Sequence, residues 1–393
     1  MPGPASSLSI PTAQSPLSSR ARAIVVGARA SDKKSCPSTP EHLSIGSSMP
    51  PTSTSKRIFL APAPRAVPDI FDESDLIRLR AVGDLVAHED GPITDQLFEA
   101  KAADAEIIIG QFDLPESRLR QATSLRAVFN VEGNFLPNID YGYCFRTGIR
   151  VLNISPVFAE PVAEAALGMA IDLARGITRS DRHFREGTEQ YGLAANLEAF
   201  SLFRQDVGLI GLGDLGKAIL PLLRPFNCRL RAYDPWLPDE YVRALGCEAA
   251  SLEEVFRCSR LVFIVAGVTS QNQGFLGAQQ FASMQRGSAI VLVSRAAVVD
   301  FDAMLDFADK GHIRFATDVF PEEPLSSEHR ARRTNNSILC AHQAGALETA
   351  IKRIGKMVVA DAELIMRGLP PVLCKNAQPE TVDMFRSKPV SKT

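Results

Sequence analysis

Residues 206–220 read DVGLIGLGDLGKAIL, and this stretch decides the fold. The apolar run Val207–Ile210 predicts a buried strand that leads directly into Gly211, Gly213 and Gly216 and then into a helix. In a G-x-G-x-x-G motif the first glycine makes a tight turn, the second lets the backbone approach a pyrophosphate, and the third lets the helix pack against the strand. The stretch therefore predicts a dinucleotide-binding βαβ unit, with Asp214 and Leu215 at the start of the anion-binding helix.

The next strand supplies the context that a lone glycine motif lacks. Arg229–Tyr233 is a second strand-like run, and Asp234 follows it at the distance from the motif that the dinucleotide pattern requires. A carboxylate there accepts hydrogen bonds from ribose hydroxyls and repels a 2′-phosphate. The sequence thus favours NAD over NADP as the cofactor.

Further strand-like runs on both sides of the motif predict an α/β protein. They are short and apolar, and stretches with helical spacing separate them, which is typical of βαβ units and parallel sheets. The runs are Arg57–Ala61, Ala105–Gly110, Leu125–Val131, Arg150–Ile154, Leu261–Val265, Ala289–Val293 and Arg314–Thr317.

One long helix is expected between residues 161 and 187, where alanine and leucine recur at helical spacing. This helix would bridge two domains, which is also the number that a chain of 393 residues favours. Its apolar face needs a partner, and the sequence leaves open whether that partner is a core of the same chain or a second subunit.

Composition argues against two classes of function. A net charge of -2 gives no field that would recruit nucleic acid, and no apolar run reaches the roughly 18 residues needed to span a membrane. The seven cysteines are scattered without a C-x-x-C pair, so we expect no metal site and no disulfide framework. Reduced thiols favour a cytoplasmic protein.

The first 56 residues differ from the rest, because they are crowded with serine and proline and carry more basic than acidic side chains. We expect a disordered leader over residues 1–56. Two alternatives stay open. Residues 1–48 could be an organelle transit peptide, or Met49 could be the true start of the protein.

Candidate chemistry lies at the ends of the later strands. Hydride transfer to a 2-oxo acid needs a cation for the substrate carboxylate and an acid that cycles near neutral pH, for which histidine paired with a carboxylate is suited. Arg295, Glu323 and His342 supply this set. Each alone has an ordinary alternative: a solvated arginine, a charged loop and a structural histidine.

Taken together, these segments resemble the D-isomer-specific 2-hydroxyacid dehydrogenase family from roughly Arg57 to Leu369. The motifs that carry the resemblance are GLGDLGKA, VLVSRAAVVD, DVFPEEP and AHQAG. The resemblance implies that Arg295 binds the substrate carboxylate and that His342 is the acid/base oriented by Glu323. It also implies that Ser294 and Asp318 contact the cofactor, Asp318 at the nicotinamide.

The resemblance implies two similar lobes, with a doubly wound (Rossmann) NAD lobe inserted into a flavodoxin-like substrate lobe. The expected limits are a substrate-binding domain over 57–155, the NAD-binding domain over 156–343, a C-terminal return to the substrate domain over 344–375 and a tail over 376–393. Family members are commonly homodimers built through the long helix before the glycine motif. The implied activity is an NAD-dependent 2-hydroxyacid dehydrogenase or 2-oxoacid reductase, acting on a small molecule.

The chain departs from the family pattern where the substrate should bind. The family's Gly-x-Gly turn is replaced by Glu132-Gly133-Asn134, and Glu132 would lie unfavourably near an anionic substrate unless it turns away or meets a polar or cationic group. The identity of the 2-hydroxy acid therefore stays open. A different class of function, an NAD(H)-sensing binding protein or co-repressor of the same fold, is the alternative.

Overall fold

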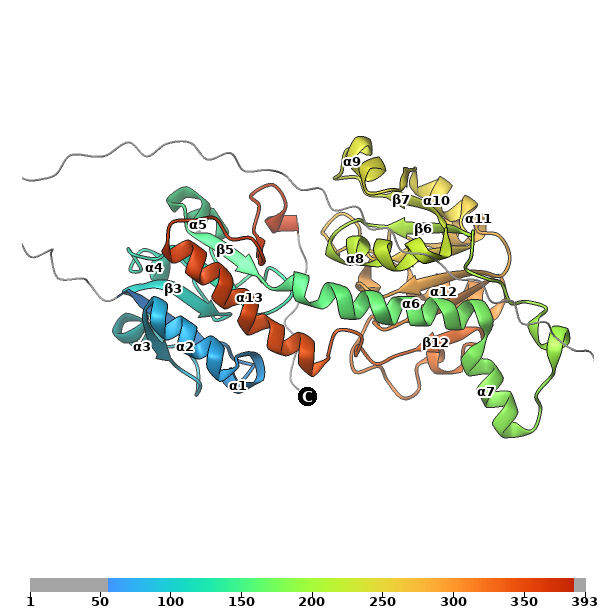
Figure 1. Ribbon diagram of the computed structural model, residues 1–393, viewed down its shortest axis with the longest axis horizontal. Coiled ribbons are helices and arrows are strands. Elements are labelled where there is room, and N and C mark those ends of the chain that lie inside the picture. Colours follow the sequence, from blue (N-terminus) through green and yellow to red (C-terminus); the bar gives the residue numbers. More distant parts are fainter. Residues whose placement is uncertain (1–55, 385–393) are drawn as a thin grey trace, which may run out of the picture. The chain divides into compact units, whose positions relative to one another are not determined.

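The computed structural model describes residues 56–384, which form two α/β lobes, each built on its own sheet (Figure 1). The leader expected over residues 1–56, with its transit-peptide and start-site alternatives, lies outside the described residues except for Lys56.

The sheet of the first lobe has the strand order β13-β5-β4-β3-β1-β2. Its five parallel strands therefore follow the order 2-1-3-4-5 of flavodoxin-like folds. The sixth, β13, pairs with β5 in the antiparallel direction. The strands are β1 (Arg57–Ala61), β2 (Asp84–Ala87), β3 (Ala105–Gly110), β4 (Ala127–Asn130), β5 (Arg150–Asn153) and β13 (Lys375–Asn376).

Alternation along β1 shows how the first lobe buries both faces of its sheet. Ile58 and Leu60 belong to a core that α1, α2 and α13 cover, whereas Phe59 and Ala61 belong to a second core on the other face, under α3, α4 and α5. The helices are α1 (Val67–Ile70), α2 (Glu73–Val82), α3 (Asp95–Lys101), α4 (Glu116–Leu119), α5 (Tyr141–Thr147) and α13 (Glu348–Met366).

The sheet of the second lobe is parallel throughout, with the order β12-β11-β10-β9-β6-β7-β8. Counted from β6, this is the 3-2-1-4-5-6 order of a doubly wound dinucleotide-binding fold, extended by a seventh strand. The strands are β6 (Asp206–Ile210), β7 (Arg229–Tyr233), β8 (Glu248–Ala249), β9 (Leu261–Ile264), β10 (Ser288–Leu292), β11 (Ile313–Thr317) and β12 (Ser337–Leu339).

Helices again cover both faces of this sheet. One core holds side chains of α6, α8 and α9, and the other holds side chains of α10, α11 and α12. The helices are α6 (Ala159–Arg175), α7 (Ile177–Glu186), α8 (Asp214–Leu223), α9 (Asp239–Ala244), α10 (Leu252–Cys258), α11 (Ala278–Ser283) and α12 (Phe301–Asp309).

The prediction of a single helix over residues 161–187 was wrong, because α6 and α7 are separate helices (Figure 1). Gly176 ends α6 in the left-handed conformation with φ +67°, which a glycine adopts without steric cost. The two halves also differ in burial. Eight residues of α6 are buried, seven of them in the core of the second lobe, whereas α7 has no buried residue.

The chain returns to the first lobe through α13, and a buried carboxylate fixes that return. Asp361 is fully buried, and its oxygens accept hydrogen bonds from the backbone N–H groups of Val372, Leu373 and Cys374. The expected tail should begin at residue 376, but Asn376 belongs to β13 and Ala377 is buried. The ordered part of the first lobe thus extends beyond the expected boundary.

An ion-pair network ties β6 to β7 at the start of the second sheet. Arg231 Nη1 lies 2.7 Å from Asp206 Oδ1, and Arg229 pairs with the same carboxylate. Hydrogen bonding from Arg229, aided by Arg231, holds the pKa of Asp206 at about 2, below the ordinary 3.8, although partial burial opposes this shift.

We predict that Asp206→Asn lowers the free energy of unfolding at neutral pH by about 1–2 kcal/mol, a range that allows for solvent screening. Because the folded-state pKa is depressed, this stabilisation is present above pH ~4 and is lost as the pH falls towards 2. Urea unfolding of the unmutated protein and of Asp206→Asn, at neutral pH and in acid, measures the difference in their free energies of unfolding. The exposed Asp90→Asn is the control, and a difference that does not narrow in acid contradicts the prediction.

Candidate active site

The glycine motif forms a backbone cradle at the start of α8. Gly211 has φ +95°, and a Cβ atom there would lie 2.8 Å from the Ala266 Cα, so this position requires glycine. A Cβ atom on Gly216 would lie 2.5 Å from the Gly211 carbonyl oxygen, which shows how closely the helix meets the strand. At Gly213, in contrast, a Cβ atom would have no described atom within 4 Å. The Gly213 backbone is therefore open to approach, as the second glycine of a pyrophosphate-binding motif should be.

Asp234 lies beside this cradle at the end of β7, and backbone groups hold its carboxylate in place. Leu212 N donates to Oδ2 at 2.8 Å, and Trp236 N donates to Oδ1 at 3.0 Å. A pocket of about 360 Å³ adjoins the carboxylate, with Tyr233 and Ser251 in its lining. A fixed acid beside a pocket at the carboxyl ends of β7 and β8 suits the ribose of a dinucleotide.

Asp214, the first residue of α8, has partners that the sequence did not indicate. Its Oδ2 accepts a hydrogen bond of 3.1 Å from Ser155 Oγ and forms an ion pair of 3.1 Å with Lys375 Nζ. Lys375 belongs to β13 of the first lobe, so a cation from the end of the chain offsets an acid at the expected pyrophosphate site. Leu215, next in the motif, is half-buried against the core under α6.

Ser294 and Arg295 follow β10, at the carboxyl edge of the second sheet. Ser294 is buried and donates from Oγ to the Ile264 carbonyl oxygen at 3.2 Å, while its own carbonyl accepts from Arg295 Nη1 at 2.7 Å. Arg295 is half-buried. Burial lowers the pKa of its guanidinium, and the nearby carboxylates of Glu323 and Glu132 oppose that shift. The charges of Glu323 and Glu132 therefore both act on Arg295, as expected for residues of one site.

His342 and Glu323 form a direct pair. The distance from His342 Nδ1 to Glu323 Oε2 is 2.6 Å, and Glu323 Oε1 accepts from the Phe320 backbone N–H at 2.9 Å. Both side chains are about one-third exposed, at 38% and 34%. Because Glu323 engages Nδ1, Nε2 is the ring nitrogen that can exchange a proton with a ligand. A histidine oriented by a carboxylate is an arrangement for general acid/base chemistry.

Asp318 holds the turn that presents His342. Its carbonyl oxygen accepts from His342 N at 2.8 Å, and its carboxylate oxygens accept from the backbone N–H groups of Gln343 and Ala344, both at 2.9 Å. His342 has φ +50°, a left-handed conformation that is unfavourable for a residue with a side chain. The three hydrogen bonds to the buried Asp318 compensate for that strain. The contact between Asp318 and a nicotinamide stays a prediction.

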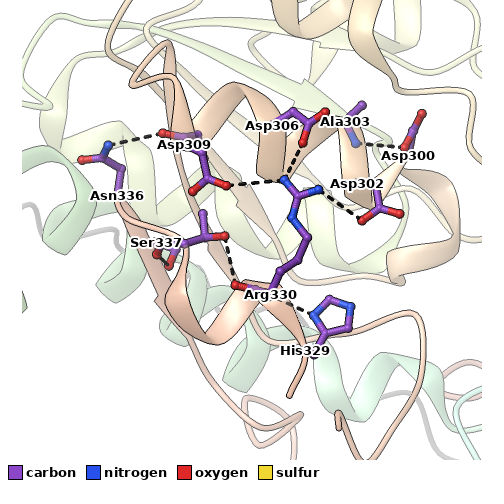
Figure 2. A network of polar contacts seen from close by, with 12 residues as sticks. Asp300, Asp302, Ala303, Asp306, Asp309, His329, Arg330, Asn336 and Ser337 are labelled. Carbon is purple, nitrogen blue, oxygen red and sulfur yellow. Dashed lines mark hydrogen bonds and ion pairs between the residues drawn. The ribbon is translucent and has the colours of Figure 1, made fainter. Parts of the chain in front are cut away.

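The loop that delivers Glu323 is anchored to α12 by a cluster of charges (Figure 2). Arg330 lies among the helix's aspartates, 3.8 Å from Asp302 and 3.4 Å from Asp309, and it also pairs with Asp306. The hydrogen bond from Arg330 lowers the pKa of Asp306. A network of this kind restrains a loop better than an isolated surface ion pair does.

The expected substrate loop follows β4. Gly133 and Asn134 are half-buried, whereas Glu132 is buried and pairs with Arg65, whose Nε lies 3.1 Å from Oε1. Glu132 therefore meets a cationic group, one of the two outcomes that the sequence left open. Arg65 itself was not anticipated, and the only available signal was a basic residue just after the first strand.

Two features are absent from residues 56–384. No group of three or more histidine, cysteine, aspartate or glutamate side chains is placed to hold a metal ion. None of the helices in this range combines the length and the apolar character that crossing a bilayer demands.

The chain is similar to known proteins in both sequence and structure. Residues 167–344 match the pattern of the NAD-binding domain of D-isomer specific 2-hydroxyacid dehydrogenases. The chain is 44% identical to a phosphoglycerate oxidoreductase from Rhizobium etli of known crystal structure, covering 83% of this chain and 100% of that one with a TM-score of 0.77.

Two curated relatives are more distant. A glyoxylate reductase from Korarchaeum cryptofilum is 28% identical over 239 residues, which are 60% of this chain and 72% of that protein. A D-3-phosphoglycerate dehydrogenase from Methanocaldococcus jannaschii is 27% identical over 308 residues, which are 77% of this chain but only 57% of that protein.

Proposed function

The chain belongs to the D-isomer specific 2-hydroxyacid dehydrogenase family, and from this we propose that it transfers a hydride between NAD(H) and a small D-2-hydroxy acid or 2-oxo acid. The observation that carries the proposal is the 2.6 Å pair between His342 and Glu323, in the same electrostatic environment as the half-buried Arg295. A paired histidine together with a half-buried cation provides the acid and the carboxylate anchor that the reaction needs.

Three described residues have separate roles in the proposed reduction. NADH, when bound, supplies the hydride. Arg295 binds the substrate carboxylate through its planar guanidinium, which also orients the carbonyl. His342 holds on Nε2 the proton that passes to the carbonyl oxygen, and Glu323 keeps Nδ1 protonated and the ring in place. In the oxidative direction His342 accepts the hydroxyl proton.

The cofactor cradle fits a dinucleotide, and the charges around Asp234 favour NAD over NADP. The Asp234 carboxylate is a fixed negative charge that would lie against a 2′-phosphate. The two arginines of β7 do not offset it, because Arg229 pairs with Asp206 and Arg231 pairs with Asp206 and Glu248.

The names of the two curated relatives refer to two chemically different substrates. Glyoxylate is a small monoanion, whereas phosphoglycerate carries a phosphate besides its carboxylate. The reaction class proposed for this chain covers both, and the substrate lobe must distinguish between them.

Six cysteines lie within the described residues, and all six are free thiols. We therefore propose a reducing compartment such as the cytoplasm. The transit-peptide alternative concerns residues 1–48, which lie outside the described residues.

We propose a homodimer, built through the segment 177–197 that follows the break at Gly176. Large apolar side chains gather there on the surface, among them Phe184 at 63% exposure, Tyr191 at 76% and Leu197 at 78%. A concentration of exposed apolar side chains is typical of an interaction surface, whereas α6 is already buried within its own lobe.

His342→Asn is expected to lower kcat for reduction of 2-oxo acids by about 100-fold or more, because the proton donor is lost. Glu323→Gln should lower kcat less, by roughly 10- to 100-fold, since the histidine remains but its orientation weakens. A panel of 2-oxo acids with NADH, followed by the loss of nicotinamide absorbance, measures both. Glu322→Gln, on the exposed neighbour, is the control. Turnover unchanged in His342→Asn would overturn the mechanism, and NADH binding without any turnover would favour a sensing protein.

Asp234→Ala should weaken NADH binding by about tenfold and narrow the preference for NADH over NADPH, because the ribose acceptor and its charge are both removed. Titration of each cofactor, followed by the fluorescence of the neighbouring Trp236, measures the two affinities. If the unmutated protein uses NADPH as well as NADH, the assignment of Asp234 is wrong.

The double substitution Leu193→Asp, Leu197→Asp should convert the dimer into a monomer, because two carboxylates would be buried in an apolar interface. Sedimentation velocity gives the mass of each species. Val372→Asp, at an exposed apolar residue of the first lobe, is the matched control and should stay dimeric. A monomeric unmutated protein at micromolar concentration contradicts the proposal.

A further inference from the structure

The substrate lobe contains an ion pair that the reaction as described does not use. Arg65 and Glu132 meet through a two-point contact, with Nε 3.1 Å from Oε1 and Nη2 3.2 Å from Oε2. The two side chains are only 21% and 11% exposed. A bidentate contact with little solvent access holds both groups in one geometry and neutralises both charges locally.

The backbone fixes this pair at the edge of the sheet where ligands bind. Arg65 lies in the turn after β1 and Glu132 directly after β4, so both stand at carboxyl ends of parallel strands. Arg65 Nε also donates to the Val131 carbonyl oxygen at 3.2 Å, and Glu132 N donates to Asn130 Oδ1 at 2.9 Å. The first contact restrains the Arg65 side chain, and the second fixes the backbone from which the Glu132 side chain leaves.

Glu132 also lies within electrostatic reach of Arg295, the proposed anchor for the substrate carboxylate. Burial lowers the pKa of the Arg295 guanidinium, and the carboxylates of Glu323 and Glu132 both act against that effect. A substrate held on Arg295 is therefore near a carboxylate whose charge Arg65 balances. The remaining lone pairs of Glu132 can accept a hydrogen bond from a hydroxyl group, but they offer an anion neither a donor nor a free cation.

Resting on the function proposed above, we propose that the Arg65–Glu132 pair is a charge filter that determines substrate specificity. It selects 2-oxo acids whose side group is uncharged and carries a hydroxyl, and it rejects those with a second anionic group such as a phosphate ester. Glu132 acts by cancelling the positive charge of Arg65, so that the pair offers no free cation to a second anionic group. Arg65 is a positioning residue that holds Glu132 and whose own positive charge is cancelled by it.

The test uses two substrates that differ only by a phosphate: 3-hydroxy-2-oxopropanoate and its 3-phosphate ester. For the unmutated protein with NADH, kcat/KM should be at least about tenfold higher for the unphosphorylated acid, because a second anionic group would lose water at this site without gaining a free cation. Glu132→Gln keeps the shape of the side chain but leaves Arg65 as an unbalanced cation. It should shift the ratio by about tenfold or more towards the phosphate ester.

A substitution at Arg65 should change the ratio of the two kcat/KM values in the opposite direction. Arg65→Gln leaves Glu132 unbalanced and should increase the discrimination against the phosphate ester, while Arg65→Lys, which keeps the charge, should restore most of the original ratio. Glu99→Gln removes an exposed acid from the same lobe and should leave the ratio unchanged. A loss of stability alone would lower both rates together and would not move the ratio in opposite directions in two variants.

Binding separates this proposal from the function on which it rests. Calorimetry of the protein–NADH complex with D-glycerate and with its 3-phosphate ester, neither of which NADH can reduce, gives the same ratio without turnover. Shifts in Kd of the expected sign support the filter, even if no 2-oxo acid is reduced and the enzymatic proposal falls. Ratios that stay constant across Glu132→Gln and Arg65→Gln overturn the filter, as does equal affinity of the unmutated protein for both ligands.

Discussion

The buried carboxylate of Asp318 is the interaction on which the geometry of the proposed site depends. It stands at the end of β11 and accepts hydrogen bonds from two backbone N–H groups just after His342. Those bonds compensate for the left-handed backbone of His342 and fix the direction in which the histidine leaves the chain. Without them the turn would lose its strained conformation, and the 2.6 Å contact with Glu323 would lose its alignment.

Around this turn, charge is balanced by pairs, and the partners often come from distant parts of the chain. Asp214, at the start of the cofactor-binding helix, is balanced by Lys375, and Glu132 in the substrate loop by Arg65. Each pair allows an acid to remain where an anionic ligand is expected to approach. Such compensation matters most where water is partly excluded, because an unpaired charge there is costly.

The two sheets bring these groups together because both present the carboxyl ends of their strands. The expected residues on the second sheet follow β6, β7, β10, β11 and β12. On the first sheet the expected substrate loop follows β4, and Arg65, which was not expected, follows β1. In parallel sheets successive strands end at the same edge, so residues far apart in sequence are collected there. The Arg330 network, in turn, restrains the long loop between β11 and β12 that carries Glu323.

The amino-acid sequence by itself determined the features that depend on local patterns. Short apolar runs predicted the parallel strands, the spacing of Gly211, Gly213 and Gly216 predicted the tight strand–helix turn, and Asp234 marked the proposed ribose end of the cradle. The roles of Arg295, Glu323 and His342 were implied by the resemblance to the family, which rests on short motifs in the sequence.

The tertiary structure alone decided what depends on contacts between distant residues. The pairing of Arg65 with Glu132, the ion pair of Lys375 with Asp214 and the hold of Asp318 on the histidine turn leave no periodic trace in the sequence. The division of α6 from α7 at Gly176 belongs here too, because an isolated glycine in a helical pattern ends the helix only when packing on either side differs. Side-chain periodicity reports which face of an element is buried, whereas the partner that meets it is chosen only when the chain folds.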